Sequence, residues 1–291
     1  MRLPNFEYFE PTTLEEALNL LNQYGNDAHL LAGGTDVLVK MRNGRLKPKA
    51  LIGLQGIEEL NGISFDPDKG LTVGANARIT EVATNDHILK YYPALAHAAQ
   101  VMANVQVRNM GTIVGNLCNA APSAENAPPL MAMGGEVKLQ KLGSNRSLPL
   151  DKFFKGPGIT ALDKGEIMTS VFAPVPAPKS GAAYKRISAR CGVDIAAVSV
   201  GAMVSLDNAT CTDVRLVLGA VAPVPLRAEA AENLLRGQKW SLELARNVAL
   251  QAAEEAKPIT DVRASADYRK KMVVVLTYRA VVEAYERAVK N

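Results

Sequence analysis

Alternating prolines divide the chain at Pro174–Pro178, where every second residue is proline. Proline fixes φ and has no N–H donor, so such a run favours an extended, stiff connector over a helix or an inner strand. The chain has 291 residues, which is enough for two domains. We therefore predict one domain at residues 1–174 and a second at residues 180–291, joined by a linker at residues 175–179.

The charge of the chain is small and scattered. Lys and Arg number 33 and Asp and Glu number 29, which leaves a net charge of +4, and no dense basic face is interleaved with aromatic residues. These features argue against nucleic acid as a partner. Hydrophobic residues make up 48% of the chain, which is typical of an ordinary globular protein.

No stretch of the sequence has the form of a membrane span or of a secretory signal. A helix needs about 20 apolar residues to cross a bilayer, whereas the longest candidate, residues 195–204, is interrupted by Ser199 and Gly201. The opening sequence MRLPNFEYFE lacks the apolar core of a signal peptide. We therefore expect a cytoplasmic protein without a membrane span.

Neither the cysteines nor the histidines have metal-ligand spacing. The cysteines are Cys118, Cys191 and Cys211, and the histidines are His29, His87 and His97. No CxxC pair occurs, and an odd number of distant cysteines fits reduced thiols better than a disulfide framework. We expect no metal site in this chain, because zinc and iron–sulfur sites usually need four ligands, often in close pairs.

The first 55 residues have the pattern of a compact βαβ unit. Thr13 and Glu16 have the spacing of a helix capping box, and Gly25 is suited to end that helix. A short apolar strand, a tight turn, a short helix and a second strand follow at residues 29–32, 33–36, 37–42 and 50–54. Because a crossover joins the two strands, we expect them to be parallel.

The rest of the chain mixes strands and helices. Apolar periodicity predicts strands at residues 71–75, 136–140 and 167–172, and strands or strand–helix pairs at residues 182–187, 196–206 and 212–221. It predicts helices at residues 80–84, 92–102, 128–133, 242–256 and 264–289.

The segment Leu30–Val37, LLAGGTDV, is the first candidate ligand site. Glycines let the backbone adopt positive φ and approach a ligand closely. Exposed N–H groups at a helix start suit an anion such as a pyrophosphate, and Thr35 adds a hydroxyl. The pattern is neither GxGxxG nor a Walker A loop. Alone, it fits a tight structural turn as well as a phosphate cradle.

The segment Gly111–Asn116, GTIVGN, is the second candidate, and small and polar residues continue from it to Glu125. Such a stretch can wrap a ligand with backbone donors, and the Glu125 carboxylate can accept hydrogen bonds from ribose hydroxyls. On its own the segment fits a packing loop equally well.

Taken together, the two segments resemble the flavin-binding subunit of the molybdenum hydroxylases, the family of the xanthine dehydrogenase and carbon monoxide dehydrogenase medium subunits. The resemblance runs through the whole chain. It is carried by Phe6–Ala17, Ala32–Asp36, Val73–Ala75, Gln106–Asn116, Tyr184–Arg186 and Asp194–Ala196.

The resemblance implies an α+β fold in two parts. An N-terminal FAD-binding region, of the type found in vanillyl-alcohol oxidases, has two subdomains at about residues 1–55 and 56–174, with FAD between them. A smaller α+β C-terminal domain follows it.

The resemblance also implies the residues that bind FAD. The first loop, expected to hold the pyrophosphate and adjoining ribose, consists of Leu30, Leu31, Ala32, Gly33, Gly34, Thr35, Asp36 and Val37. The second, expected to contact the phosphates and the flavin side, consists of Thr112, Ile113, Val114, Gly115 and Asn116. Glu125 stands where the family usually has Asp near the adenosine, and Met102 and Met168 pack near the cofactor. Lys185 is expected beside the isoalloxazine, where a cation stabilises an anionic reduced flavin.

In this family the work is divided among three subunits. A large subunit holds a molybdenum cofactor and hydroxylates the substrate, and a small subunit carries two [2Fe–2S] clusters. This chain is then expected to take up single electrons, store two on FAD and pass them to NAD⁺ or another acceptor, in a heterotrimer or its dimer. No catalytic acid, base or nucleophile is assigned, and the four-cysteine insertion of the 4-hydroxybenzoyl-CoA reductase branch is missing from the sequence.

Two alternatives belong to other classes of protein. One is a stand-alone flavoenzyme resembling the UDP-N-acetylenolpyruvoylglucosamine reductases or vanillyl-alcohol oxidases, and the other is a non-redox scaffold of the same fold. The intact glycine-rich loops disfavour the scaffold, and the match of the C-terminal region disfavours the stand-alone enzyme.

Overall fold

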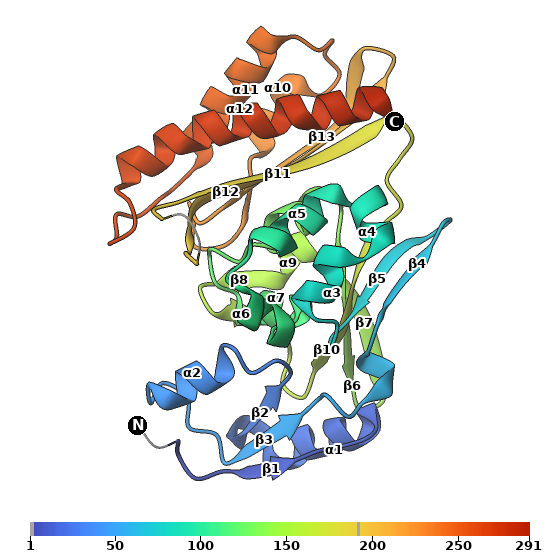
Figure 1. The fold of residues 1–291 in the computed structure, drawn as a ribbon, viewed down its shortest axis with the longest axis vertical. Coiled ribbons are helices and arrows are strands. Elements are labelled where there is room, and N and C mark those ends of the chain that lie inside the picture. The colour runs from blue at the N-terminus through green and yellow to red at the C-terminus, as the bar shows by residue number, and fades with distance from the viewer. Residues whose placement is uncertain (1–2, 191–192) are drawn as a thin grey trace.

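The computed structural model describes residues 3–190 and 193–291, so that Cys191 lies outside the described residues. Three units follow one another along the longest axis of the molecule (Figure 1). Each is built around its own β-sheet, and a small two-stranded sheet completes the set. The predicted α+β class is confirmed.

The first unit is a parallel sheet with the strand order β1-β3-β2. Its strands are β1 (Glu7–Phe9), β2 (Ala28–Leu31) and β3 (Ala50–Gly53), and its helices are α1 (Leu14–Tyr24) and α2 (Val37–Arg42). The predicted parallel pairing is confirmed, with Leu30 opposite Ile52. The predicted cap is also present, because Thr13 Oγ1 accepts a hydrogen bond from the Glu16 N–H at 3.2 Å.

The second unit is an antiparallel sheet with the order β4-β5-β10-β6-β7. Its strands are β4 (Ile63–Asp66), β5 (Gly70–Gly74), β6 (Glu136–Lys141), β7 (Ser144–Pro149) and β10 (Ile167–Pro174). Its helices are α3 (Ile79–Thr84), α4 (Asp86–Tyr91), α5 (Pro93–Val101), α6 (Val105–Met110), α7 (Ile113–Asn119), α8 (Ala127–Ala132) and α9 (Leu150–Phe153). The short strands β8 (Phe154–Gly156) and β9 (Ile159–Thr160) pair with each other.

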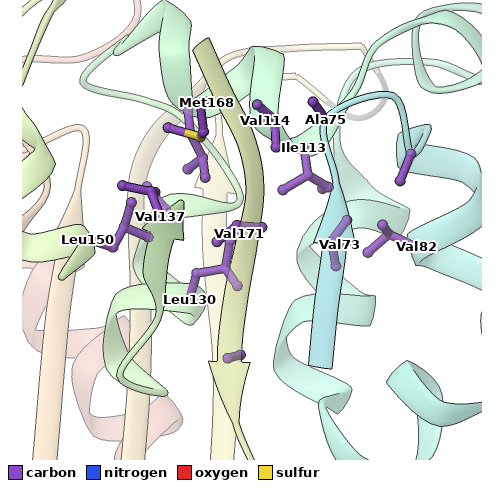
Figure 2. Packing of buried hydrophobic residues seen from close by; sticks show 14 of the residues in the cluster. Val73, Ala75, Val82, Ile113, Val114, Leu130, Val137, Leu150, Met168 and Val171 are labelled. Atoms are coloured by element: carbon purple, nitrogen blue, oxygen red, sulfur yellow. The ribbon is translucent and has the colours of Figure 1, made fainter. Parts of the chain in front are cut away.

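The core of the second unit lies between this sheet and its helices. Figure 2 shows Val73, Val137 and Val171 of the sheet gathered with Ile113 of α7 and with Leu130 of α8. All five side chains are at most 1% exposed, so they anchor the helices to the sheet through the hydrophobic effect.

The third unit is an antiparallel sheet with the order β11-β12-β13-β14. Its strands are β11 (Ser180–Ser188), β12 (Ala196–Asp207), β13 (Thr210–Gly219) and β14 (Leu226–Arg227), and its helices are α10 (Glu229–Leu235), α11 (Leu242–Glu255) and α12 (Ala266–Lys290). Helix α12 lies across the sheet (Figure 1), so closely that a Cβ on Gly181 would overlap the Ala284 carbonyl oxygen.

The second and third units share an apolar interface. Helix α5 contacts β11, and α8 contacts β12 and β13. Ala94 and Ala98 of α5 pack on Tyr184 of β11, and Val217 of β13 belongs to the core of the second unit. The interface therefore holds β11 against α5 and α8, the helices that precede and follow the second glycine-rich segment in the chain.

Two regions differ from the helices predicted from the sequence. Residues 113–119 form α7, although the glycine content had suggested only a loop. The helix expected at residues 92–102 begins at Pro93, because proline suits the first turn of a helix, and a separate helix α4 ends at Tyr91.

Within the described residues, no helix is long and apolar enough to cross a membrane.

The contact between α8 and β12 leads to a stability prediction. A Cβ on Gly201 would lie 2.5 Å from the carbonyl carbon of Pro128, so Gly201→Ala must push the two units apart. Overpacking of this kind costs about 1–3 kcal/mol. We expect a lower midpoint in thermal unfolding than for the control Gly156→Ala, whose Cβ would have no neighbour within 3.5 Å. Equal midpoints for the two variants would contradict the close approach.

Candidate cofactor site

The two glycine-rich segments, far apart in sequence, meet backbone to backbone. A Cβ on Gly33 would overlap the carbonyl oxygen of Met110 and would lie 2.8 Å from the Cα of Gly111. No side chain fits there, so this close approach requires glycine. Gly34 is needed for another reason, because its φ of +72° is a conformation that residues with a Cβ rarely adopt.

Helix α7 starts at a fixed place within the second segment. Thr112 is its N-cap, and Thr112 Oγ1 accepts a hydrogen bond from the Gly115 N–H at 2.9 Å. The carbonyl oxygen of Gly111 accepts a hydrogen bond from the Ile79 N–H at 2.9 Å. These bonds tie the start of α7 to α3 and hold it beside the first segment.

A cavity of about 480 Å³ lies where the two segments meet the end of β2 and the start of β10. This volume falls in the range of about 300–1,000 Å³ that is usual for cofactor sites. Most of the predicted site residues line it, namely Leu30, Ala32, Gly33, Gly34, Thr35, Asp36, Val37, Met102, Thr112, Val114, Gly115, Asn116 and Met168. Tertiary structure thus brings the two segments to one cavity.

Four predicted residues do not line this cavity: Leu31, Ile113, Glu125 and Lys185. Ile113 is fully buried in the core of the second unit. The Lys185 ammonium pairs with the carboxylate of Glu283 on α12, and Glu283 also lies 2.7 Å from Arg287. The Lys185 side chain is therefore held by the third unit.

Several residues that line the cavity were missed in the sequence, among them His29, Lys40, Cys118, Asn119 and Lys164. A signal existed for Lys40, since it lies on the predicted helix at residues 37–42, one turn after Asp36 of the first segment, and therefore on the same side as Asp36. Asn119 could not be placed in the same way, because its position at the end of α7 is known only once residues 113–119 are recognised as a helix.

Asn119 links the two segments. Its Oδ1 accepts a hydrogen bond from Lys40 Nζ at 2.6 Å, and its Nδ2 donates to Asp36 Oδ1 at 3.0 Å. The Lys ammonium can only donate and the ionised Asp carboxylate can only accept, so the orientation of the amide is determined. The end of α7 is thereby tied to α2 within the cavity wall.

Burial sets the protonation of two side chains in the wall. Burial, followed by the positive charge of Lys40, lowers the pKa of His29 below its ordinary value. Burial raises the pKa of the Cys118 thiol to about 12. At neutral pH this wall therefore presents a neutral imidazole and a protonated thiol, and Cys118 offers no thiolate nucleophile.

Two further wall residues, Glu166 and Asp163, carry carboxylates that are already paired. Arg146 donates to both carboxylate oxygens of Glu166 at 2.7 Å and lies 3.4 Å from the Asp163 carboxylate. The hydrogen bonds from Arg146 are the largest cause that lowers the pKa of Glu166. This arrangement reduces the electrostatic repulsion that an anionic ligand would meet.

Glu125 joins the second and third units instead of lining the cavity. It is 6% exposed, the Tyr184 hydroxyl donates a hydrogen bond to its Oε2, and Arg186 Nε lies 3.3 Å from its Oε1. Arg186 also donates to the carbonyl of Val101 at 2.7 Å. Burial raises the pKa of Glu125 to about 7, while Arg186 and Tyr184 oppose the rise.

The next residue connects this cluster with the cavity. Asn126 is fully buried, and its Nδ2 lies 3.2 Å from Asn116 Oδ1 and 3.3 Å from Met102 Sδ. Asn116 and Met102 both line the cavity. Asn126 therefore links the contact between the second and third units, at Glu125, to two residues of the cavity wall.

The described residues, 3–190 and 193–291, contain no group of three or more His, Cys, Asp or Glu side chains that could hold a metal ion. The cavity instead has the chemistry of an organic anion site. Glycine backbone and helix starts suit phosphate groups, and Leu54, Ile79 and Met168 supply apolar wall. An FAD molecule, with its diphosphate and two ring systems, fits this combination.

Two sequence families match the chain in agreement with this geometry. The first, described as the FAD binding domain in molybdopterin dehydrogenase, covers residues 4–176. The second, described as the CO dehydrogenase flavoprotein C-terminal domain, covers residues 182–284. The chain thus has an FAD-binding domain followed by a C-terminal flavoprotein domain.

Relatives match over nearly the whole chain. The glyceraldehyde dehydrogenase medium chain of Sulfolobus acidocaldarius is 32% identical over 281 residues, which cover 96% of this chain and 98% of the relative. The xanthine dehydrogenase FAD-binding subunit of Escherichia coli O157:H7 is 30% identical over 282 residues, with 97% and 96% covered. A chain of carbon monoxide dehydrogenase from Hydrogenophaga pseudoflava matches with a TM-score of 0.94 and 33% identity, over 99% of both chains.

This chain belongs to the FAD-binding medium subunits of the molybdenum hydroxylase family. The resemblance drawn from the sequence is confirmed.

The burial of Glu125 leads to a pH prediction. Its pKa is raised in the folded protein from 4.5 to about 7, so the folded state holds this proton more tightly than the unfolded chain. The stability that Glu125 contributes is present below pH 4.5 and is lost as pH rises through about 7. Glu125→Gln removes this loss.

We expect the free energy of unfolding of Glu125→Gln, relative to wild type, to rise by at least about 1 kcal/mol between pH 5 and pH 8. Urea unfolding at the two pH values measures it, with the exposed Glu59→Gln as control. A difference that does not change with pH would show that Glu125 titrates normally.

Proposed function

We propose that the cavity between the two glycine-rich segments binds FAD, and that its lining residues are the cofactor contacts of this chain. The proposal rests on one observation above all, the backbone contact between Gly33 and Met110, because it leaves open backbone where a diphosphate needs close approach. When bound, FAD supplies storage for two electrons and exchange of one at a time.

The roles of the chain's own residues follow from their places. The starts of α2 and α7 carry backbone N–H groups that suit phosphate oxygens. Two of these groups already have partners, because the Leu38 N–H donates to the Gly34 carbonyl and the Gly115 N–H to Thr112 Oγ1. Thr35 adds a hydroxyl donor at the start of α2. Met102 and Met168 form apolar wall that excludes water and orients a ring system. No side chain in this scheme acts as acid, base or nucleophile.

We further propose the complex in which this subunit works and the path of its electrons. Its partners are a large molybdopterin-binding subunit and a small [2Fe–2S] subunit, in a cytoplasmic heterotrimer or its dimer. Electrons pass from the clusters to FAD and then to NAD⁺ or another acceptor, as in a xanthine dehydrogenase-like oxidoreductase. Support comes from relatives named as medium chains of dehydrogenases, which implies larger and smaller companion chains.

The same reasoning gives the proposed domain division. An FAD-binding domain occupies residues 1–174, a linker residues 175–179, and a C-terminal domain residues 180–291. The two family matches, at residues 4–176 and 182–284, support a division near this linker. The N-terminal subdomain of residues 1–55 corresponds to the parallel sheet, and that of residues 56–174 to the five-stranded sheet.

Replacing Gly33 tests the cofactor site. In Gly33→Ala the new methyl group overlaps the Met110 carbonyl, so the segments must separate and the cavity must change shape. We expect the purified, folded variant to retain less than about a tenth of the wild-type flavin, a loss of about 1.4 kcal/mol or more. Flavin absorbance per chain measures this, with Gly156→Ala as control. Full flavin content in Gly33→Ala would contradict the proposed cradle.

Gentle purification of the native protein tests the complex. We expect flavin bands together with molybdenum, iron and two other chains in fixed ratio. Flavin in a lone chain that oxidises or reduces a substrate by itself would favour the stand-alone flavoenzyme. A chain that takes up no FAD even when the cofactor is added would favour the scaffold.

A further inference from the structure

Lys40 is a cation in the wall of the cavity. It lies on α2, one turn after Asp36, and its Nζ is 2.6 Å from Asn119 Oδ1. Among residues 3–190 and 193–291, no carboxylate forms an ion pair with Lys40 at a distance of 4 Å or less. An ammonium has three N–H donors. Within the described part of the chain, one of them donates a hydrogen bond to Asn119.

The position of this ammonium is fixed from outside its own helix. Asn119 is the last residue of α7, and the next residue, Ala120, turns into the left-handed region with φ 48°. The amide of Asn119 is oriented by Asp36 on one side and by Lys40 on the other. A lysine held in this way gives up less side-chain entropy when it binds a ligand than a free lysine does.

A second lysine in the wall is a useful contrast. Lys164 also lines the cavity, but it is exposed, and no hydrogen bond or ion pair of its side chain is found among the described residues. Lys40 is half-buried and anchored, and its charge reaches far enough into the wall to lower the pKa of His29. Of the two lysines, Lys40 is therefore the one prepared for an anion.

We propose that Lys40 binds the diphosphate of the cofactor and that Asn119 is its positioning residue. The inference rests on the proposed function and adds a side-chain cation to the backbone N–H groups of both segments. A diphosphate carries two negative charges, and a charge-assisted hydrogen bond from an anchored ammonium complements backbone donors. Asp36 serves the same arrangement by orienting the Asn119 amide. Burial raises the pKa of its carboxyl group, and the positive charge of Lys40 opposes that rise.

The test is FAD affinity of the full chain after its flavin has been removed, measured by quenching of flavin fluorescence at low salt and at 0.5 M salt. The variants are Lys40→Met, Asn119→Leu and the control Lys47→Met, which removes the same charge from an exposed loop outside the cavity. Circular dichroism checks that each variant is folded.

We expect Lys40→Met to weaken FAD binding about tenfold or more at low salt, because a hydrogen bond to a charged group is lost. The difference from wild type should shrink at high salt, because salt screens the attraction between charges. Asn119→Leu should cause a smaller loss and keep the salt dependence of wild type, since the ammonium is still present. Lys47→Met should bind FAD as wild type does.

Two results would overturn the inference while leaving the proposed function intact. One is wild-type affinity in Lys40→Met, and the other is a loss of the same size at both salt concentrations, which would mark Lys40 as a structural residue only. A wild-type chain that binds no FAD at either salt concentration would instead overturn the proposed function, and this inference with it.

Discussion

The close approach of Gly33 to the Met110 carbonyl is the constraint on which the site depends. It joins the parallel sheet to the helices of the second unit through main-chain atoms, which cannot change rotamer to make room. Because the contact is made of backbone, no side chain of Gly33 or Gly111 occupies the place where the two segments meet. The first glycine permits the approach and the second permits the turn, so the two neighbouring glycines solve different steric problems.

The sequence was sufficient to predict elements with strong local patterns. The parallel pairing of β2 with β3 and the cap at Thr13 followed from short-range signals, and both are present. Helix α7 was missed because Gly115 lies inside it and glycine costs a helix about 1 kcal/mol relative to alanine. Its cap at Thr112 and its fully buried Ile113 and Leu117 provide the compensation, and this burial exists only once the sheet has formed.

The candidate site, too, could be predicted from the sequence only in part. The two loops could be read from their glycines, whereas Lys40 and Asn119 become partners only through the tertiary contact between α2 and α7. Glu125 is the opposite case, since its sequence position suggested a ribose contact but its carboxylate accepts a hydrogen bond from Tyr184. A motif gives the neighbourhood of a residue along the chain, but the partner that satisfies a buried carboxylate comes from another unit.

The third unit therefore does more than cover one side of the second. Arg186 on β11 reaches both Glu125 and the Val101 carbonyl, which lies at the end of α5 directly before Met102. Asn126 extends the same network to Asn116 and Met102 in the cavity wall. A shift of β11 relative to α5 would thus move two wall residues together, through an ion pair and hydrogen bonds that are mostly shielded from water. Low local polarity strengthens each bond and makes each unpaired group costly, so the position of the C-terminal sheet and the shape of the cavity are coupled.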